Sequence, residues 1–417
     1  AGDYSCAPFV PFSSLGQNQI VPYVTIPLCR AVLRPVRPDK PVTRIAIAFE
    51  YPTLNGGEQS MLAVLEEFST EPLDLVAIAP SRGPLAERLA DLGIPIEALS
   101  LQNADGGKLP PQWAGERLLT AVRRVAPDLL HANSLSMGRL TGRIRSDLRI
   151  PTVAHLRDII RLSAAARSDI NRNDRLLAVS QATRDFHINE GLSADRVQVL
   201  YNGVDCQRFT PRSSDGWLHA ELGLPRDSML LAIIGQIGLR KAHDVLADAC
   251  ALLSSRLGDV SRRLHLLVIG ERFSQKPESV EFERSFFANM QSAGWEGRVH
   301  ALGYRSDIER ILPEIDLLVH PARQEPLGRV LLEGAACGRA IVATNVGGTA
   351  EIVTDHASAL LISPDHPQEL AFAIASLIVD ESQRRQLGTA ARATIVRRFS
   401  QSQSAAGLKL AWNDLLT

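Results

Sequence analysis

Residues 320–353 read HPARQEPLGRVLLEGAACGRAIVATNVGGTAEIV, and this stretch is the most informative part of the sequence. An apolar run ends at His320, a polar loop follows, and an amphipathic helix begins near Gly328. Glu325 lies in the loop and Glu333 on the helix, with seven residues between them. A second apolar run follows the helix. Apolar strands that alternate with amphipathic helices predict a parallel sheet covered by helices on both faces.

The start of this helix predicts an anion site. Its first N–H groups are free, and the positive end of its dipole is aimed at whatever lies in the loop, most simply a phosphate. Carboxylates on either side accept hydrogen bonds from sugar hydroxyls. The combination indicates a sugar nucleotide. An ordinary strand–helix–strand unit with solvent-facing glutamates is the alternative.

The same segment resembles the Glu-x7-Glu signature of retaining, nucleotide-sugar-dependent glycosyltransferases of family four, which have the GT-B fold. The resemblance implies that Glu325 contacts the donor hexose and Glu333 the ribose, with Leu327, Gly328 and Arg329 lining the donor site. The loop reads Glu-Pro-Leu-Gly where family members usually read Glu-Gly-Phe-Gly. Downstream, Ala-Ala-Cys-Gly and Gly-Gly-Thr-Ala-Glu also match the family.

Composition places the chain among ordinary globular proteins. It has 417 residues, 45% apolar and 22% charged, with a formal net charge of −1. That length suits two domains, and the balanced charge gives no reason to expect nucleic acid as a partner. No apolar run approaches the roughly 20 residues that cross a bilayer. The first residues lack the layout of a secretory signal, and five cysteines without metal-like spacing favour a reducing cytoplasm; pairing of Cys6 with Cys29 stays open.

The sequence divides into two similar halves after an irregular, Pro-rich arm at 1–40. The regular pattern predicts a Rossmann-like acceptor domain over 41–205 and a Rossmann-like nucleotide-sugar donor domain over 206–399, two doubly wound sheets facing across a cleft. The resemblance implies that a last helix, within 400–417, crosses back onto the first domain. Strands are expected at 44–49 and 73–79 and near 129, 153 and 176, then at 230–234, 264–269, 299–302, 317–319 and 340–343, with helices at 58–68 and 85–92.

A phosphate cradle is predicted after the first strand of the second half, at Gly-Gln-Ile-Gly-Leu-Arg-Lys. Gly235 lets the backbone approach a diphosphate, and Arg240 and Lys241 neutralise it. The run resembles the family's Gly-Arg-x-x-x-x-Lys-Gly, although Gln236 and Ala242 replace the usual Arg and final Gly. Two solvated surface cations are the alternative.

In the first half, Gly56 and Gly57 precede a helix and permit close approach of an anion or sugar. They resemble the family's glycine loop, which faces the acceptor and the donor phosphates; a plain turn is the alternative. His155 ends an apolar strand, and the resemblance places it at the donor sugar, whereas a lone histidine there is more often structural. Gly270 and Tyr304 match loops that flank the nucleotide base in the family.

Two further matches are architectural. Ser180 begins a strand-to-helix junction and suits a helix cap, with or without a ligand role. Tyr-Asn-Gly-Val-Asp, from Tyr201, matches the family's interdomain hinge.

Several motifs are missing from the sequence. It has no Asp-x-Asp metal–diphosphate motif and no His/Cys cluster with zinc spacing. A Gly-x-Gly-x-x-Gly fingerprint after a strand and a Gly-x-Ser-x-Gly elbow are also missing, which disfavours dehydrogenases and hydrolases.

A basic run contains Arg139, Arg143, Arg145 and Arg149. A solvated helix face is the favoured interpretation. The alternative is peripheral contact with anionic lipid at the inner face of the membrane, at about 1 kcal/mol per basic residue.

The sequence therefore predicts a retaining, metal-independent hexosyltransferase without a cofactor. The donor is a nucleoside-diphosphate sugar, and the acceptor is a carbohydrate or lipid-linked hydroxyl, in keeping with cell-envelope glycan or glycoconjugate synthesis. Catalytic roles are expected for His155, Arg240, Lys241 and Glu325. A sugar-nucleotide epimerase, a phosphorylase and a non-catalytic sugar-nucleotide-binding scaffold are the alternatives.

Overall fold

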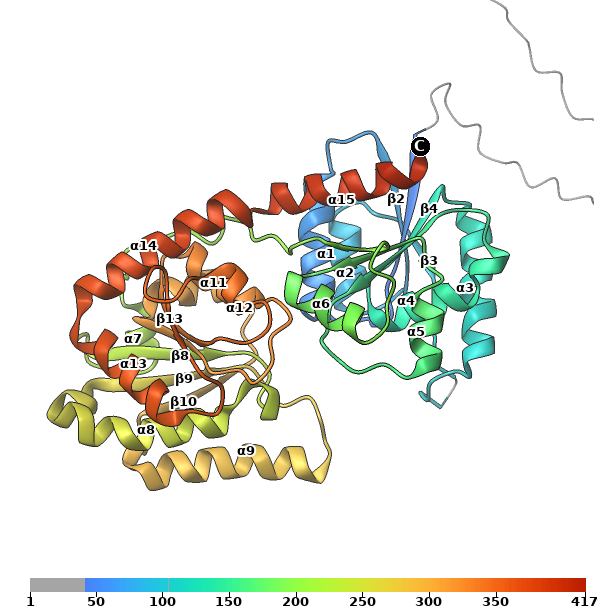
Figure 1. Ribbon diagram of the computed structural model, residues 1–417. Coiled ribbons are helices and arrows are strands. Elements are labelled where there is room, and N and C mark those ends of the chain that lie inside the picture. The colour runs from blue at the N-terminus through green and yellow to red at the C-terminus, as the bar shows by residue number, and fades with distance from the viewer. Residues whose placement is uncertain (1–41, 104) are drawn as a thin grey trace, which may run out of the picture. The chain divides into compact units, whose positions relative to one another are not determined.

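The computed structural model describes residues 42–417 except residue 104. The expected arm over 1–40, with Cys6 and Cys29, lies outside the described residues. Residues Val42–Thr417 form one compact unit that contains two parallel β-sheets covered by helices (Figure 1). The predicted fold class is therefore confirmed.

The first sheet has seven strands in the order β3-β2-β1-β4-β5-β6-β7. Every pairing in it is parallel. Three-residue edge strands, β3 and β7, extend the sheet beyond the strands expected from the sequence. Its elements are β1 Thr43–Ala48, α1 Gly56–Glu67, β2 Leu73–Ala79, α2 Pro84–Asp91, β3 Ile96–Ala98, α3 Pro111–Val125, β4 Leu129–Ala132, α4 Leu135–Arg143, the 3-10 turn Arg145–Asp147, β5 Thr152–Leu156, α5 Ala164–Ile170, β6 Arg175–Ala178, α6 Gln181–Asn189 and β7 Val197–Val199.

The second sheet has six strands in the order β10-β9-β8-β11-β12-β13, again all parallel. Its elements are α7 Trp217–Glu221, β8 Met229–Ile234, the 3-10 turn Leu239–Lys241, α8 His243–Leu257, the 3-10 helix Gly258–Arg263, β9 Leu264–Ile269, α9 Pro277–Met290, the irregular turn Gln291–Trp295, β10 Val299–Gly303, α10 Ile308–Ile311, the 3-10 turn Leu312–Glu314, β11 Leu317–His320, α11 Arg329–Ala336, β12 Ala340–Thr344, α12 Thr349–Ile352, β13 Leu360–Ile362, α13 Pro367–Val379, α14 Glu381–Arg398 and α15 Gln401–Leu416.

Both sheets are buried on both faces, which explains their continuous apolar strands. In β1, Ile45 and Ile47 pack under α1, α2 and α15, while Ala46 and Ala48 face the layer of α3 and α4. In the second sheet, alternate strand residues face α8, α9 and α13 on one side and α11 and α14 on the other. Because both faces of each sheet are covered, polar side chains that could contact a ligand are expected at the ends of the strands.

The last two helices join the two sheets. α14 packs in the core of the second sheet, and α15 packs over the first sheet in the layer of α1 and α2 (Figure 1). Between them the backbone of Val204 pairs with that of Phe399 and Gln401. A Cβ on Gly203 would lie 2.6 Å from the Cα of Gln401, so only glycine fits this crossing.

Candidate active site

The loop after β8 approaches the loop after β9 at a pair of glycines. Gly235 has φ +141° and Gly270 has φ +131°, in a region that L side chains rarely adopt. A Cβ on Gly270 would lie only 2.1 Å from the carbonyl oxygen of Gly235. The two backbones therefore meet at the carboxyl edge of the second sheet, beside a pocket of about 220 Å³ that the segment from Gln236 to Lys241 lines on one side.

Lys241 and Arg240 take different positions at this edge. Lys241 is 9% exposed, and its ammonium lies 2.5 Å from Oε2 of Glu325. Arg240, the middle residue of the 3-10 turn, is exposed. The structure therefore brings Lys241 together with the glutamate loop and leaves Arg240 at the surface beside it.

Glu325 is the centre of a buried polar cluster. His320, at the end of β11, lies 2.8 Å through Nε2 from the same Oε2 that Lys241 contacts. Burial raises the pKa of Glu325, but the charge of Lys241 and the hydrogen bond from His320 outweigh it and hold that pKa below its usual range. Both contacts use Oε2, and no hydrogen bond to Oε1 is seen within the described chain.

His320 was not expected from the sequence as a site residue. Its burial lowers its pKa, as does Lys241, so it is neutral and donates one hydrogen bond to the glutamate. The sequence feature that could have indicated His320 is its position, five residues before Glu325 and directly at the end of an apolar strand.

The glutamate loop is held by the segments around it. The N–H of Gly348 donates to the carbonyl of Glu325 at 2.9 Å, and a Cβ on Gly347 would lie 1.9 Å from that oxygen. Leu327 is 1% exposed and packs in the apolar core of the second sheet. Gly328, with φ +105°, turns the chain into α11. Glycines and one buried leucine thus fix the loop.

Glu333 lies on α11 and is 6% exposed. Its Oε1 is 2.7 Å from Nε of Arg329, one helical turn earlier. Burial raises the pKa of Glu333, and Arg329 only partly offsets it. Arg329 also donates to the side chain of Gln59 on α1, so this pair reaches the first sheet's helix layer.

The first sheet supplies a second polar group at the ends of β4 and β5. His155 is 3% exposed, and its Nδ1 lies 3.0 Å from Nε2 of His131 on β4. Burial, with the charge of Arg157 added, lowers the pKa of both histidines, that of His131 to about 3. Both are therefore uncharged at neutral pH.

Arg157 is a further residue that sequence reasoning missed. Its guanidinium contacts the side chains of Asn133, His155 and Asn202. Desolvation lowers its pKa to about 10. A Cβ on Gly57 would lie 2.9 Å from Cδ of Arg157. Gly56 and Gly57, expected to precede the helix, are the first two residues of α1, so the start of α1 lies against this arginine. The sequence feature that could have indicated Arg157 is its position two residues after His155, because side chains two residues apart lie on the same face of an extended chain.

Two side chains, Ser180 and Glu351, join the N-terminus of α6 to the second sheet's loops. Ser180 caps the helix by accepting from the N–H of Thr183 at 3.0 Å and donates to the carbonyl of Pro326 at 2.5 Å. Glu351, from α12, accepts from the N–H groups of Gln181 and Ala182, each at 2.8 Å. The junction therefore both caps a helix and holds the glutamate loop.

Tyr304 follows β10 and is 57% exposed. Its backbone N–H donates to Oε1 of Glu271 at 3.1 Å, and the N–H of Gly270 donates to the carbonyl of Gly303 at 2.8 Å. The two loops predicted to flank a nucleotide base thus lie against each other beside the glycine pair.

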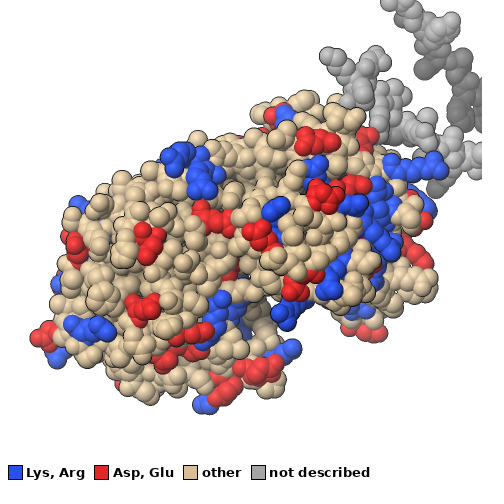
Figure 2. Space-filling view, in the orientation of Figure 1, with Lys and Arg blue, Asp and Glu red and all other residues tan. Residues whose placement is uncertain are grey.

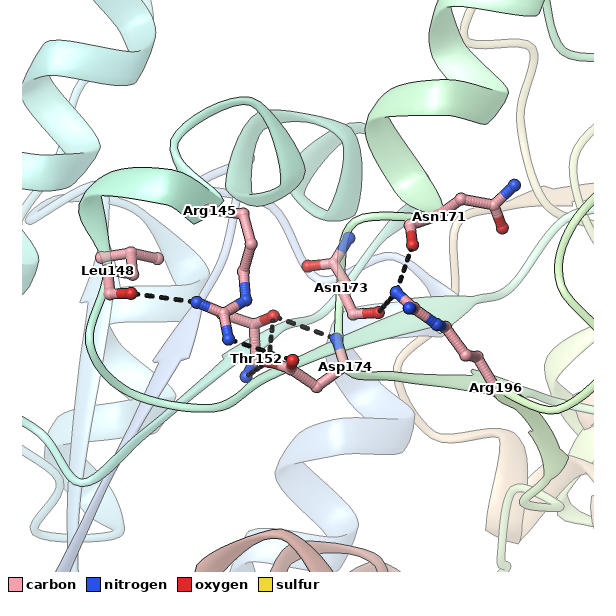
Figure 3. A network of polar contacts seen from close by, with 7 residues as sticks. All are labelled: Arg145, Leu148, Thr152, Asn171, Asn173, Asp174 and Arg196. Carbon is pink, nitrogen blue, oxygen red and sulfur yellow. Dashed lines mark hydrogen bonds and ion pairs between the residues drawn. The ribbon is translucent and has the colours of Figure 1, made fainter.

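Three arginines of the basic run, Arg139, Arg143 and Arg145, are paired with acids. Arg139 and Arg143 both contact Oδ2 of Asp169, at 3.1 and 2.8 Å. Arg145 donates to Asp174, within the network that Figure 3 shows. Over the face seen in Figure 2, Lys and Arg side chains are likewise accompanied by Asp and Glu. This pairing favours the solvated-face interpretation of the run.

Residues 42–417, leaving out residue 104, contain neither a metal-ligand cluster nor a membrane-spanning helix. No group of three or more His, Cys, Asp or Glu there could hold a metal ion. No helix among these residues is long and apolar enough to span a bilayer.

Two parallel, helix-covered sheets with polar residues at their strand ends match the GT-B fold of solved structures. Residues 54–208 match the Glycosyltransferase Family 4 and residues 218–394 the Glycosyl transferases group 1. The D-inositol 3-phosphate glycosyltransferase of Saccharomonospora viridis is 30% identical over 66% of this chain and 67% of its own length. The chain belongs to glycosyltransferase family four.

Other relatives agree. The D-inositol 3-phosphate glycosyltransferase of Corynebacterium glutamicum is 27% identical over 372 residues, 82% of this chain and 86% of that protein. The crystal structure of HepE from Anabaena with UDP and glucose superposes with a TM-score of 0.79 at 23% identity, covering 89% of this chain and 100% of that one. The protein is thus a glycosyltransferase of carbohydrate biosynthesis.

Proposed function

We propose that this enzyme transfers a hexosyl unit from a nucleoside-diphosphate sugar to an acceptor hydroxyl, with retention of configuration and without a metal ion. One observation carries the proposal. The buried Glu325 is kept ionised by Lys241 and His320 through one oxygen, and its other oxygen is left for a ligand. An ionised carboxylate with a free oxygen suits a sugar hydroxyl, which can donate but carries no charge.

The diphosphate would lie beside Lys241. The glycine pair lets the backbone come close, and α11, a helix of eight residues, begins at Arg329 with no side-chain cap on its free N–H groups. Arg240 is near enough along the chain to add a second cation from the surface. HepE, whose structures were solved with UDP and with UDP-glucose, supports a donor of this class.

Other predicted contacts follow from the same placement. Glu333 would accept from the ribose hydroxyls, for which it must exchange part of its contact with Arg329. The base would lie between the loops of Gly270 and Tyr304. His155 would contact the hexose, with Gly56 and Gly57 facing the phosphates.

In the transfer step the bond from the anomeric carbon to the diphosphate oxygen breaks, and a bond to the acceptor oxygen forms on the same face. The acceptor proton passes to the leaving phosphate. Lys241 and the start of α11 stabilise the charge that develops on the diphosphate, the largest contribution we expect. No side chain is required as a covalent nucleophile in this scheme.

The acceptor would lie against the strand ends of the first sheet. Arg157 and the start of α1 provide positive charge there. The names of two relatives, D-inositol 3-phosphate glycosyltransferase and alpha-maltose-1-phosphate synthase, each contain a sugar or polyol phosphate. A carbohydrate or lipid-linked acceptor with a phosphate nearby is therefore the class to test first.

The test is a panel of UDP, GDP, ADP and dTDP sugars, scored by nucleotide release with and without EDTA and by NMR of the anomeric linkage. We expect release from one donor, unaffected by EDTA, and a product with the donor's anomeric configuration. Glu325→Gln should lower release at least a hundredfold, whereas the matched change at an exposed acid, Glu67→Gln, should not. Wild-type release that stops with EDTA, an inverted product or an active Glu325→Gln would each contradict part of the proposal.

A further inference from the structure

Three aromatic side chains form a buried hydrogen-bonded chain from the C-terminal helix to the candidate site. Nε1 of Trp412, on α15, lies 3.0 Å from Nδ1 of His131. Nε2 of His131 lies 3.0 Å from Nδ1 of His155. The three residues are 1%, 0% and 3% exposed. Water therefore has little access to these contacts.

The donors decide where each proton lies. The indole N–H of Trp412 can only donate, so Nδ1 of His131 must be the acceptor. A neutral His131 then carries its proton on Nε2 and donates it to Nδ1 of His155. His155 in turn must carry its own proton on Nε2.

Arg157 leads to the same assignment independently. Its Nη2 lies 3.2 Å from Nδ1 of His155, and a guanidinium has donors but no acceptor. Two donors thus converge on one ring nitrogen. The opposite nitrogen, Nε2 of His155, is buried and has no hydrogen-bond partner within the described residues. A buried N–H without an acceptor is costly, so its presence points to an oxygen supplied by a ligand.

We propose that His155 is a fixed hydrogen-bond donor to an oxygen of the bound sugar, and that Trp412 and His131 are positioning residues that set its tautomer. The identity of the ligand rests on the proposed function. The assignment of the proton does not. In this arrangement His155 cannot serve as the base that deprotonates the acceptor, because the nitrogen open to a ligand carries a proton.

The first experiment is nitrogen NMR of the full chain labelled with ¹⁵N-histidine, without any substrate. The resonances of His155 are assigned by their loss in His155→Gln. We expect a single neutral tautomer with the proton on Nε2. A proton on Nδ1, an even mixture or a charged ring at neutral pH would overturn the proposal. Because no turnover is involved, a failure of the proposed donor chemistry would leave this result standing.

The second experiment compares Trp412→Phe in two backgrounds. Phenylalanine keeps the ring packing and removes the N–H, so we expect partial appearance of the other His155 tautomer and a roughly tenfold lower kcat/KM for transfer. The exposed Trp113 on α3 is the matched control, and Trp113→Phe should change neither.

In the His155→Gln background the amide N–H takes the place of Nε2–H and has no tautomer to lose. Trp412→Phe should then have no further effect on kcat/KM. An equal drop in both backgrounds would show that Trp412 acts only through packing. If Trp412→Phe does not fold, His131→Leu breaks the same chain, and His131→Gln, which can accept from Trp412 and donate to His155, should restore it.

Discussion

The two sheets share a parallel, doubly wound topology, yet the buried polar groups at their strand ends differ in charge. At the second sheet a lysine and a glutamate are buried as an ion pair, with a neutral histidine donating to the same carboxylate oxygen. At the first sheet two buried neutral histidines lie against Arg157, whose charge is partly balanced by Glu58 and Asp158. One site keeps opposite charges together, and the other keeps rings uncharged.

The difference shows that the effect of burial on the pKa of a group depends on the charges around that group. Burial alone would raise the pKa of Glu325, but Lys241 reverses the direction. Burial lowers the pKa of His131, and Arg157 adds to it because a positive neighbour disfavours a second positive charge. Equal depth in the fold thus leaves a glutamate charged in one sheet and two histidines neutral in the other.

Removing the cation from the charged site is the largest perturbation. Lys241→Met leaves Glu325 buried without its ion-pair partner, so we expect a loss of about 3–5 kcal/mol in the free energy of unfolding, and at least a hundredfold loss of transfer. Urea denaturation and donor turnover measure the two effects. Lys276→Met, at an exposed lysine before α9, is the control and should change neither.

The double change Lys241→Met with Glu325→Leu separates stability from function. Replacing both partners by apolar groups should recover most of the stability, since no buried charge remains, while transfer stays lost. Recovery of transfer would mean that the ion pair does not contact the donor.

Acid should destabilise the fold through the buried histidines of the first sheet. The ordinary pKa of His131 is 6.5, and its pKa in the folded chain is about 3. Between these two pH values the unfolded chain binds a proton at His131 and the folded chain does not. Stability that is fully present above pH 6.5 is therefore lost as pH falls toward 3. Between pH 7 and pH 5 this group accounts for about 2 kcal/mol.

His131→Gln tests this value because glutamine keeps both hydrogen bonds but does not titrate. Urea denaturation at pH 7 and pH 5 should show a pH-dependent loss about 2 kcal/mol smaller than in the wild type. An unchanged difference between the two pH values would mean that His131 takes up its proton in the folded state.

Much of this contrast could not be predicted from the sequence, although the fold could. The apolar runs at β1, β2, β8 and β9 are long enough to be recognised, whereas the three-residue strands β3, β7 and β13 carry too little pattern. They are added at sheet edges by pairing with strands already formed.

For the site, spacing along the chain led to Glu325 and Lys241, because family motifs are local. It could not indicate Trp412, which reaches His131 from 281 residues away through the packing of α15. Nor could it show that Leu327 is in the core, since a loop residue's direction depends on the sheet beneath it.

Between the two sites, Glu351 offers a smaller test of how they are connected. It caps α6 and also accepts from the hydroxyl of Tyr201 at 2.8 Å. Glu351→Ala should lower the free energy of unfolding by about 1–2 kcal/mol, as loss of a helix cap does. Desolvation and then Glu351 raise the pKa of Tyr201 to about 12, so its ultraviolet titration should move toward 10 in the variant.

An exposed acid on α1 provides the control, since Glu67→Ala should leave both readings unchanged. If Glu351→Ala leaves stability unaffected, the contacts of Glu351 with α6 carry no net free energy.

The smallest effect should come from the basic run at the flank of the first sheet. Arg139 shares Asp169 with Arg143, and its side chain is 39% exposed, so solvent screens the pair. Arg139→Gln should therefore change the free energy of unfolding by less than about 1 kcal/mol. Sedimentation with vesicles of anionic lipid provides the second measurement. Because the arginines are already paired with an acid, Arg139→Gln should leave binding unchanged, whereas a clear loss would mean that lipid competes with Asp169 for this surface.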